Sequence, residues 1–304
     1  MHKDLYFGVN GDIHACVWEP EGEPKAVVQI VHGIAEYALR YRDFAEFLTD
    51  HGVLVVAEDH MGHGKSISDR CPQGCFSGGW FAAVADTYAL LKDTMNRYPG
   101  IPYILFGHSM GSFMVRTILQ EYPDSGIAGC VICGTGWMPE VVLKAGRMIS
   151  KLVCKKCGET KPNDTLQKLV FGGYNKRIPE PRTNYDWLSC DQKQVDAYVA
   201  DPLCGFDASA GLIRDMLTGI LHIQKKENLD KMRKALPVYF IAGDEDPVGD
   251  YGKGVLKAAD RFRSVGMETV SCQLFKGCRH EILNEISNKD IYNDILSWMS
   301  NLLK

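Results

Sequence analysis

Continuous apolar runs alternate with amphipathic segments along this chain. A short apolar run without polar interruptions is typical of a strand buried on both faces, as in a parallel sheet. The segments between the runs, such as residues 41–52 and 80–98, have helical spacing and end at glycine or proline. We therefore predict an α/β fold, a mostly parallel sheet flanked by helices. The runs are "KAVVQIVHG" at 25–33, "VLVVAE" at 53–58, "IPYILFG" at 101–107, "IAGCVICG" at 127–134 and "LPVYFIAG" at 236–243.

Two segments depart from this alternation. Residues 5–20, "LYFGVNGDIHACVWEP", have two strand-like runs around the turn pair Asn10-Gly11, which predicts a hairpin. Residues 136–206 contain no clear buried strand, but a basic amphipathic run and polar loops. We expect a core formed by residues 1–135 and 207–304, with a helical insertion at 136–206.

Composition narrows the class of protein. The 304 residues are 45% hydrophobic, which is enough for a large core, and the net charge of −4 gives no basic excess for a nucleic-acid partner. The sequence shows no secretory signal pattern and no apolar run of about 18 residues that could span a membrane. The 11 cysteines suit a reducing compartment, so we expect a cytoplasmic protein.

Ser109 lies in "GHSMG", where a strand-like run passes directly into a helix-like run. A sharp strand-to-helix turn needs small residues on both sides, and Gly107 and Gly111 supply them. The other interpretation is an ordinary glycine-rich turn. Because strand, turn and helix appear in order, we interpret Ser109 as a nucleophile.

A serine nucleophile needs a base, and in this arrangement an acid and then a histidine follow it along the chain. His280, in a polar loop after the last strand-like run, is favoured over His222, which lies in an apolar helix-like run. The acid should follow a buried strand, and "GDEDP" places Asp244 and Asp246 there. We favour Asp246 and keep Asp244 as the alternative, with a turn-stabilising role as its simpler explanation.

Two backbone amides would complete the site as an oxyanion hole. Met110 follows the serine and would begin the helix, where its N–H has no partner inside the helix. Ile34 follows the turn His32-Gly33 at the end of an early strand-like run. We expect both amides to face the developing negative charge.

Together these segments resemble a known family. "VHGIAEYALRY", "DHMGHGKS", "GHSMGS", "GDEDPVG" and "RHEILNE" are similar to motifs of the alpha/beta-hydrolase family of lysophospholipases and monoacylglycerol lipase-like serine hydrolases, related to the S33 aminopeptidases. The resemblance covers nearly the whole chain. It implies an alpha/beta-hydrolase fold with a helical lid, Ser109 as nucleophile, Asp246 as acid, His280 as base, and oxyanion amides from Ile34 and Met110.

The same resemblance implies a substrate and a mechanism. The substrate would be an acyl ester or monoacyl lipid, cleaved by two-step acyl transfer without a metal or organic cofactor. Residues 136–206 would be the lid over the acyl pocket. The early motif reads His-Gly-Ile-Ala-Glu where some monoacylglycerol lipases have His-Gly-x-Gly-Glu, so Glu36 would be a head-group contact or a structural hydrogen-bond acceptor.

Alternative functions stay open on the sequence alone. A proline-iminopeptidase-type aminopeptidase would need a carboxylate cluster near the lid, which the lid does not obviously contain. A catalytically silent binding protein would not need the ordered Ser-Asp-His set. The basic amphipathic run at 141–153 would contact a lipid surface transiently or simply pack on the core.

Several cysteine and histidine patterns suggest metal binding only weakly. Cys154 and Cys157 form a single C-x-x-C without a second pair, and His60 and His63 lie in a glycine-rich loop. We therefore expect no metal at these positions. Cys71 and Cys75 flank a short turn, but a disulfide between them is not expected in a reducing compartment.

Overall fold

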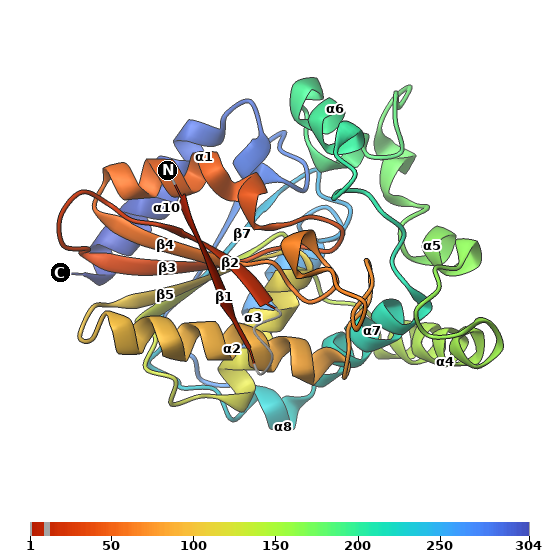
Figure 1. The fold of residues 1–304 in the computed structure, drawn as a ribbon, viewed down its shortest axis with the longest axis horizontal. Coiled ribbons are helices and arrows are strands. Elements are labelled where there is room, and N and C mark those ends of the chain that lie inside the picture. Colours follow the sequence, from red (N-terminus) through yellow and green to blue (C-terminus); the bar gives the residue numbers. More distant parts are fainter. Residues whose placement is uncertain (1, 9–12, 304) are drawn as a thin grey trace.

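A computed structural model describes residues 2–8 and 13–303. Its centre is an 8-stranded sheet in the order β1-β2-β4-β3-β5-β6-β7-β8 (Figure 1). β2 pairs antiparallel with β1 and β4, and the neighbouring strands from β4 to β8 are parallel. The strands are β1 (His2–Phe7), β2 (Ile13–Trp18), β3 (Ala26–Val31), β4 (Val53–Glu58), β5 (Tyr103–His108), β6 (Gly129–Cys133), β7 (Val238–Gly243) and β8 (Val270–Phe275).

The helices cover both faces of the sheet. α1 and α10 lie on one face in Figure 1, and α2 and α3 lie on the other. The α-helices are α1 (Arg42–Asp50), α2 (Trp80–Arg97), α3 (Met110–Glu121), α4 (Glu140–Cys157), α5 (Asp164–Val170), α6 (Gln192–Ala200), α7 (Ala210–Ile223), α8 (Lys226–Leu229), α9 (Lys253–Ser264) and α10 (Asn288–Leu302). Short 3-10 helices occur at Ala38–Tyr41, Gly64–Ser66, Tyr174–Arg177, Asp186–Leu188 and Ile282–Asn284.

The central strands are mostly apolar because each lies between two cores. In β5, Tyr103 and Leu105 pack into the cluster under α2 and α3, whereas Ile104 and Phe106 pack into the cluster under α1 and α10. A strand that alternates between two buried layers takes a polar side chain only where a hydrogen bond satisfies it, as Gln29 of β3 is bonded to Glu58 of β4. The predicted α/β fold with a mostly parallel sheet is therefore confirmed.

The two irregular segments take different forms. The predicted hairpin strands are present as β1 and β2, while its Asn10-Gly11 turn lies outside the described residues. Residues 134–237, all of which are described, contain helices and loops but no strand of the sheet. Figure 1 shows α4, α5 and α6 gathered beyond one end of the sheet. α7 packs against both α4 and α3 and so connects this region to the core.

Candidate active site

Ser109 occupies a strained turn between β5 and α3. Its φ of 53° and ψ of −119° are unusual for a residue with a side chain. The glycines on both sides are required by close packing. A Cβ on Gly107 would lie 2.5 Å from the carbonyl oxygen of Gly111, and one on Gly111 would lie 1.9 Å from that of Val31. The turn therefore projects Ser109 from the end of β5, the arrangement of a nucleophile elbow.

His280 and Asp246 meet at the ends of β8 and β7. His280 Nδ1 lies 2.9 Å from Asp246 Oδ2, and both side chains are buried. The backbone N–H of Val248 donates to the other carboxylate oxygen at 2.8 Å, which fixes its orientation. Burial acts to lower the pKa of His280, but the charge and hydrogen bond of Asp246 outweigh it, so the pKa is raised.

The two alternative residues lie in other surroundings. Asp244 accepts a hydrogen bond from the backbone N–H of Gly277 at 2.7 Å, a turn-stabilising contact. His222 Nε2 lies 3.0 Å from a carboxylate oxygen of Glu121. Neither residue lines the cavity described next.

A cavity of about 350 Å³ brings Ser109 and His280 together. Its wall includes Ile34 from the loop after β3, and also apolar side chains such as Phe171, Trp187 and Phe206 from the region between β6 and β7. The Trp187 ring lies 5.1 Å from the His280 ring, between centroids. The site is thus a partly apolar cavity that opens onto a serine and a histidine.

The predicted oxyanion residues lie beside the serine. Met110 is the first residue of α3, so its N–H has no acceptor inside the helix. A Cβ built on Gly33 would lie 3.1 Å from the Cβ of Ser109, which shows how closely the loop carrying Ile34 approaches. The structure thus brings Ile34, Ser109, Met110 and His280 to one place.

Glu36 borders the cavity but is occupied by internal donors. Its carboxylate accepts from the Gly33 N–H at 2.6 Å, the Tyr41 hydroxyl at 2.9 Å and the Arg40 guanidinium at 2.8 Å. These contacts correspond to the structural role, and they order the loop that carries Ile34.

Sequence analysis missed Arg40 and Glu281. Arg40 donates to both oxygens of Glu281, at 2.6 Å and 2.7 Å, while also contacting Glu36. Its guanidinium lies 4.7 Å over the ring of Tyr198 in α6, whose hydroxyl donates to the Ala35 carbonyl. Only part of this signal is local: Glu36 and Arg40 are four residues apart, whereas the pairing of Arg40 with Glu281, 241 positions later, depends on the fold.

The structure also describes the cysteines and histidines whose spacing only weakly suggested a metal site or a disulfide. All 11 cysteines are free thiols. Cys154 is buried and Cys157 exposed. Among the described residues, no group of three candidate metal ligands includes Cys154, Cys157, His60 or His63.

The whole chain was compared with known proteins. A family model described as "Serine aminopeptidase, S33" (Hydrolase_4) matches residues 22–287. The chain belongs to this family. It is 30% identical over 289 residues to a monoacylglycerol lipase of Mycolicibacterium smegmatis, covering 93% of this chain and 91% of that protein. It is 26% identical to the monoglyceride lipase of Homo sapiens, covering 98% and 91%.

Solved structures agree with this membership. A thermostable carboxyl esterase from Bacillus coagulans, in complex with glycerol, superposes with a TM-score of 0.91 at 29% identity, covering 100% of this chain and 99% of that one. This S33-family chain is therefore an α/β-hydrolase and a serine ester hydrolase, as its motifs predicted. Among the described residues, no helix is both long and apolar enough to cross a membrane.

Proposed function

We propose that this hydrolase cleaves the acyl ester of a monoacyl lipid, a monoacylglycerol or a lysophospholipid, through Ser109, His280 and Asp246. One observation carries the proposal: Ser109, in its strained turn, shares a cavity with His280, and His280 is hydrogen-bonded to buried Asp246. A serine, a base and an orienting acid in this order are the parts that acyl transfer needs.

In the proposed mechanism His280 accepts the Ser109 proton as the serine oxygen attacks the ester carbonyl. The amides of Ile34 and Met110 stabilise the negative oxygen of the tetrahedral intermediate. The intermediate collapses to an acyl-enzyme when His280 gives its proton to the leaving alcohol. Water then attacks the acyl-enzyme by the same route and releases the fatty acid. Asp246 holds the imidazole in orientation and stabilises its charged form.

The cavity supports a substrate with one acyl chain. Part of its wall comes from residues 136–206, which we propose to be a lid over the acyl-binding pocket, between core segments 1–135 and 207–304. Aromatic side chains in that wall, Phe171, Trp187 and Phe206, offer an apolar surface to a hydrocarbon chain. The relatives named monoacylglycerol lipase support this class of substrate.

The aminopeptidase alternative is less well supported by the cavity. A substrate amino group needs a carboxylate that is not already neutralised. The acidic residues that line the cavity are Glu36, Asp207 and Glu281. Glu36 and Glu281 are both paired with Arg40, so their charge is largely compensated, and Asp207 is then a single carboxylate of the cavity wall and not the cluster that an aminopeptidase would need.

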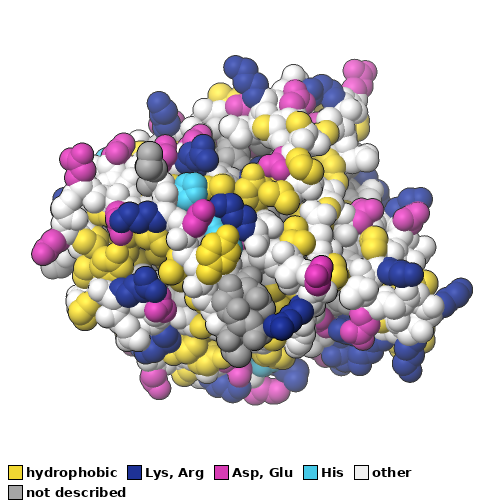
Figure 2. Space-filling view, viewed as in Figure 1, with side chains coloured by type: hydrophobic (Ala, Val, Ile, Leu, Met, Phe, Trp, Pro, Cys, Tyr) yellow, Lys and Arg dark blue, Asp and Glu magenta, His cyan; other side chains and the backbone are white. Residues whose placement is uncertain are grey.

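We also propose transient contact of the lid with a lipid surface. α4 exposes Val141, Val142, Met148 and Leu152, with exposed fractions between 53% and 79%. Lysines and arginines gather at the lower right of Figure 2, where Figure 1 places α4. Apolar side chains flanked by basic ones are typical of helices that lie on anionic membrane surfaces.

A cytoplasmic location is proposed as well, supported by the 11 unpaired cysteines.

Substrate profiling tests the function. Purified enzyme is assayed with 1-oleoylglycerol, lysophosphatidylcholine, trioleoylglycerol and prolyl anilide. We expect hydrolysis of one or both monoacyl lipids and little of the others; preference for the anilide would contradict the proposal.

Ser109→Ala should lower kcat by on the order of 10⁶-fold and abolish fluorophosphonate labelling. The exposed Ser77→Ala is the control and should label like the wild type.

A further inference from the structure

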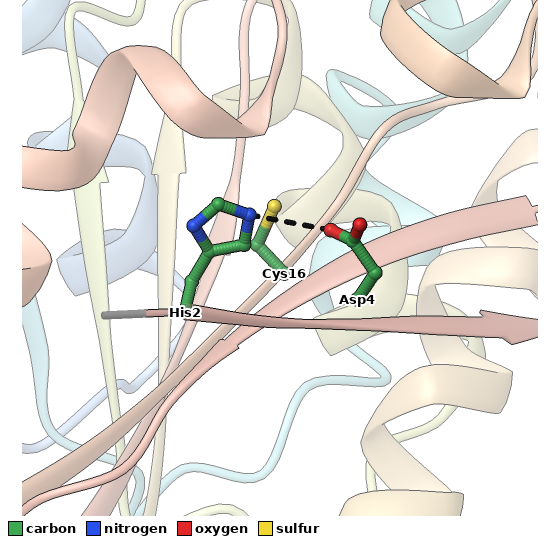
Figure 3. Close-up of side chains that lie close together, drawn as sticks. All are labelled: His2, Asp4 and Cys16. Atoms are coloured by element: carbon green, nitrogen blue, oxygen red, sulfur yellow. Dashed lines mark ion pairs between the residues drawn. The ribbon is translucent and has the colours of Figure 1, made fainter.

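A second cluster of reactive side chains lies at the β1 edge of the sheet. In the strand order this edge is four strands away from β5, after which Ser109 lies. His2 and Asp4 are alternate residues of β1, so their side chains lie on the same face. The antiparallel register places Asp4 opposite Cys16 of β2. Figure 3 shows the three side chains pointing toward one another. Their ligand atoms all lie within 4.8 Å of one another.

These three residues offer a nitrogen, an oxygen and a sulfur atom to one point. Imidazole, carboxylate and thiolate are the groups that bind zinc and related divalent transition metals. Among the described residues, no other group of three histidine, cysteine, aspartate or glutamate side chains brings its ligand atoms this close together. We propose that His2, Asp4 and Cys16 form a binding site for a divalent transition-metal ion, with zinc as the best fit, separate from the ester-hydrolase site.

The surroundings hold the carboxylate in place. Asp4 Oδ1 lies 3.2 Å from His2 Nε2 and 2.9 Å from His14 Nε2. Its other oxygen accepts from Lys65 Nζ at 2.8 Å. His14 is held in turn by Asp59 through its second ring nitrogen, at 2.8 Å. A ligand anchored by outer hydrogen bonds in this way is typical of protein metal sites.

Charge and access are also compatible with a metal ion. The Asp4 carboxylate and the Cys16 thiolate would supply two negative charges to a divalent cation, and the Lys65 ammonium, which contacts Asp4, would offset part of that charge. The Cys16 thiol loses its proton to solvent as the sulfur–metal bond forms. Cys16 is fully buried, whereas the side chains of His2 and Asp4 are 22% and 41% exposed, so the ion would enter from their side.

The simpler explanation treats the residues separately. His2 and Asp4 would be a surface ion pair, and Cys16 a core thiol beside Trp18. The two explanations can be distinguished by measurement. Only in a metal site do the Cys16 sulfur and the His2 ring bind the same ion. Such a site would fasten β1, which among the described residues pairs only with β2, to the rest of the sheet.

Cobalt titration tests the site. The full chain, without a histidine tag and stripped by chelator, is titrated with Co²⁺, and the thiolate-to-cobalt charge-transfer band is followed. Competition with Zn²⁺ gives the zinc affinity. We expect one band-forming ion per chain, displaced by zinc. Cys16→Ser should remove the band. His2→Asn should weaken zinc binding by more than about 100-fold, because losing a ligand itself should cost more than losing a residue that only hydrogen-bonds to a ligand.

Matched controls use an exposed thiol and an exposed imidazole elsewhere. Cys157→Ser and His51→Gln should leave the band and the affinity unchanged. The absence of a band, a band that survives Cys16→Ser, or one that disappears with Cys157→Ser would overturn the proposal. Should Cys16→Ser fail to fold, His2→Asn, near the chain start, decides alone: unchanged zinc affinity would refute the site. Ester hydrolysis is not used as the readout, so this result is independent of the proposed function.

Discussion

Asp246 and Asp244 are two residues apart but have different environments, and this difference should appear in the pH dependence of the enzyme. Asp246 raises the pKa of His280 against the effect of burial. In the proposed mechanism the imidazole must be neutral to accept the serine proton, so activity should fall as the pH drops through this raised pKa, above the ordinary value of about 6.5.

Asp246→Asn should shift this acidic limb to lower pH, because the charge that favours the imidazolium is lost. It should also lower kcat by about 10⁴-fold, since the histidine is no longer held in the productive tautomer. The measurement is a pH profile of kcat/KM with a soluble short-chain ester. Asp244→Asn is the matched control and should keep the wild-type limb, because its contact is with the Gly277 backbone. If Asp244→Asn were the inactive variant, the assignment of the acid would be wrong.

α4 and the segment around Asp186–Leu188 belong to the same stretch of chain but are attached differently. The Glu281 N–H donates to the Leu188 carbonyl at 2.7 Å, and Arg279 donates to the carbonyls of Asp186 and Ser189. This segment is therefore bonded to the loop that carries His280. α4 packs on α7, with Gly146 close to Leu217, and leaves Val141, Met148 and Leu152 exposed. The outer side of α4 is thus available to a lipid surface.

Leu152→Asp tests that surface. Leu152 is 60% exposed on α4, so a carboxylate there should cost little folding stability but should oppose insertion into an anionic bilayer. We expect binding to phosphatidylserine vesicles, measured by co-sedimentation, to fall by about tenfold or more. Leu256→Asp on α9, a similarly exposed leucine in the core region, is the control and should bind as the wild type. Equal loss in both variants would point to nonspecific charge repulsion.

Arg40 joins parts of the molecule that are distant in sequence. It contacts Glu36 after β3, Glu281 after β8 and the Tyr198 ring in α6. Burial alone would raise the pKa of Glu281, but the charge and hydrogen bonds of Arg40 lower it to about 2. The guanidinium therefore holds together the loops on which Ile34 and His280 lie.

Arg40→Ala should destabilise the fold by about 3–5 kcal/mol, because it leaves buried carboxylates without their counter-charge. Urea unfolding followed by circular dichroism measures this change. Arg42→Ala, two residues later and exposed, should change the unfolding free energy by less than about 0.5 kcal/mol. A similarly small effect for Arg40→Ala would show that water or a rearranged side chain replaces the guanidinium.

Much of the fold could be predicted from the sequence because its signals are local. The apolar run from Tyr103 and the glycines around Ser109 predict a buried strand and a sharp turn without knowledge of their neighbours. Strand and helix periodicity depend on residues a few positions apart. The hairpin strands and the strand-free stretch between β6 and β7 were predictable for the same reason.

The sequence by itself thus determined the α/β fold and the turn that carries Ser109. Only the tertiary structure decided which acid reaches His280, how Glu36 and Glu281 share Arg40, and that His2, Asp4 and Cys16 face one point. Each of these contacts joins residues from different loops or paired strands. Their distances depend on strand order and register, which the packing of the whole sheet fixes and no local pattern encodes.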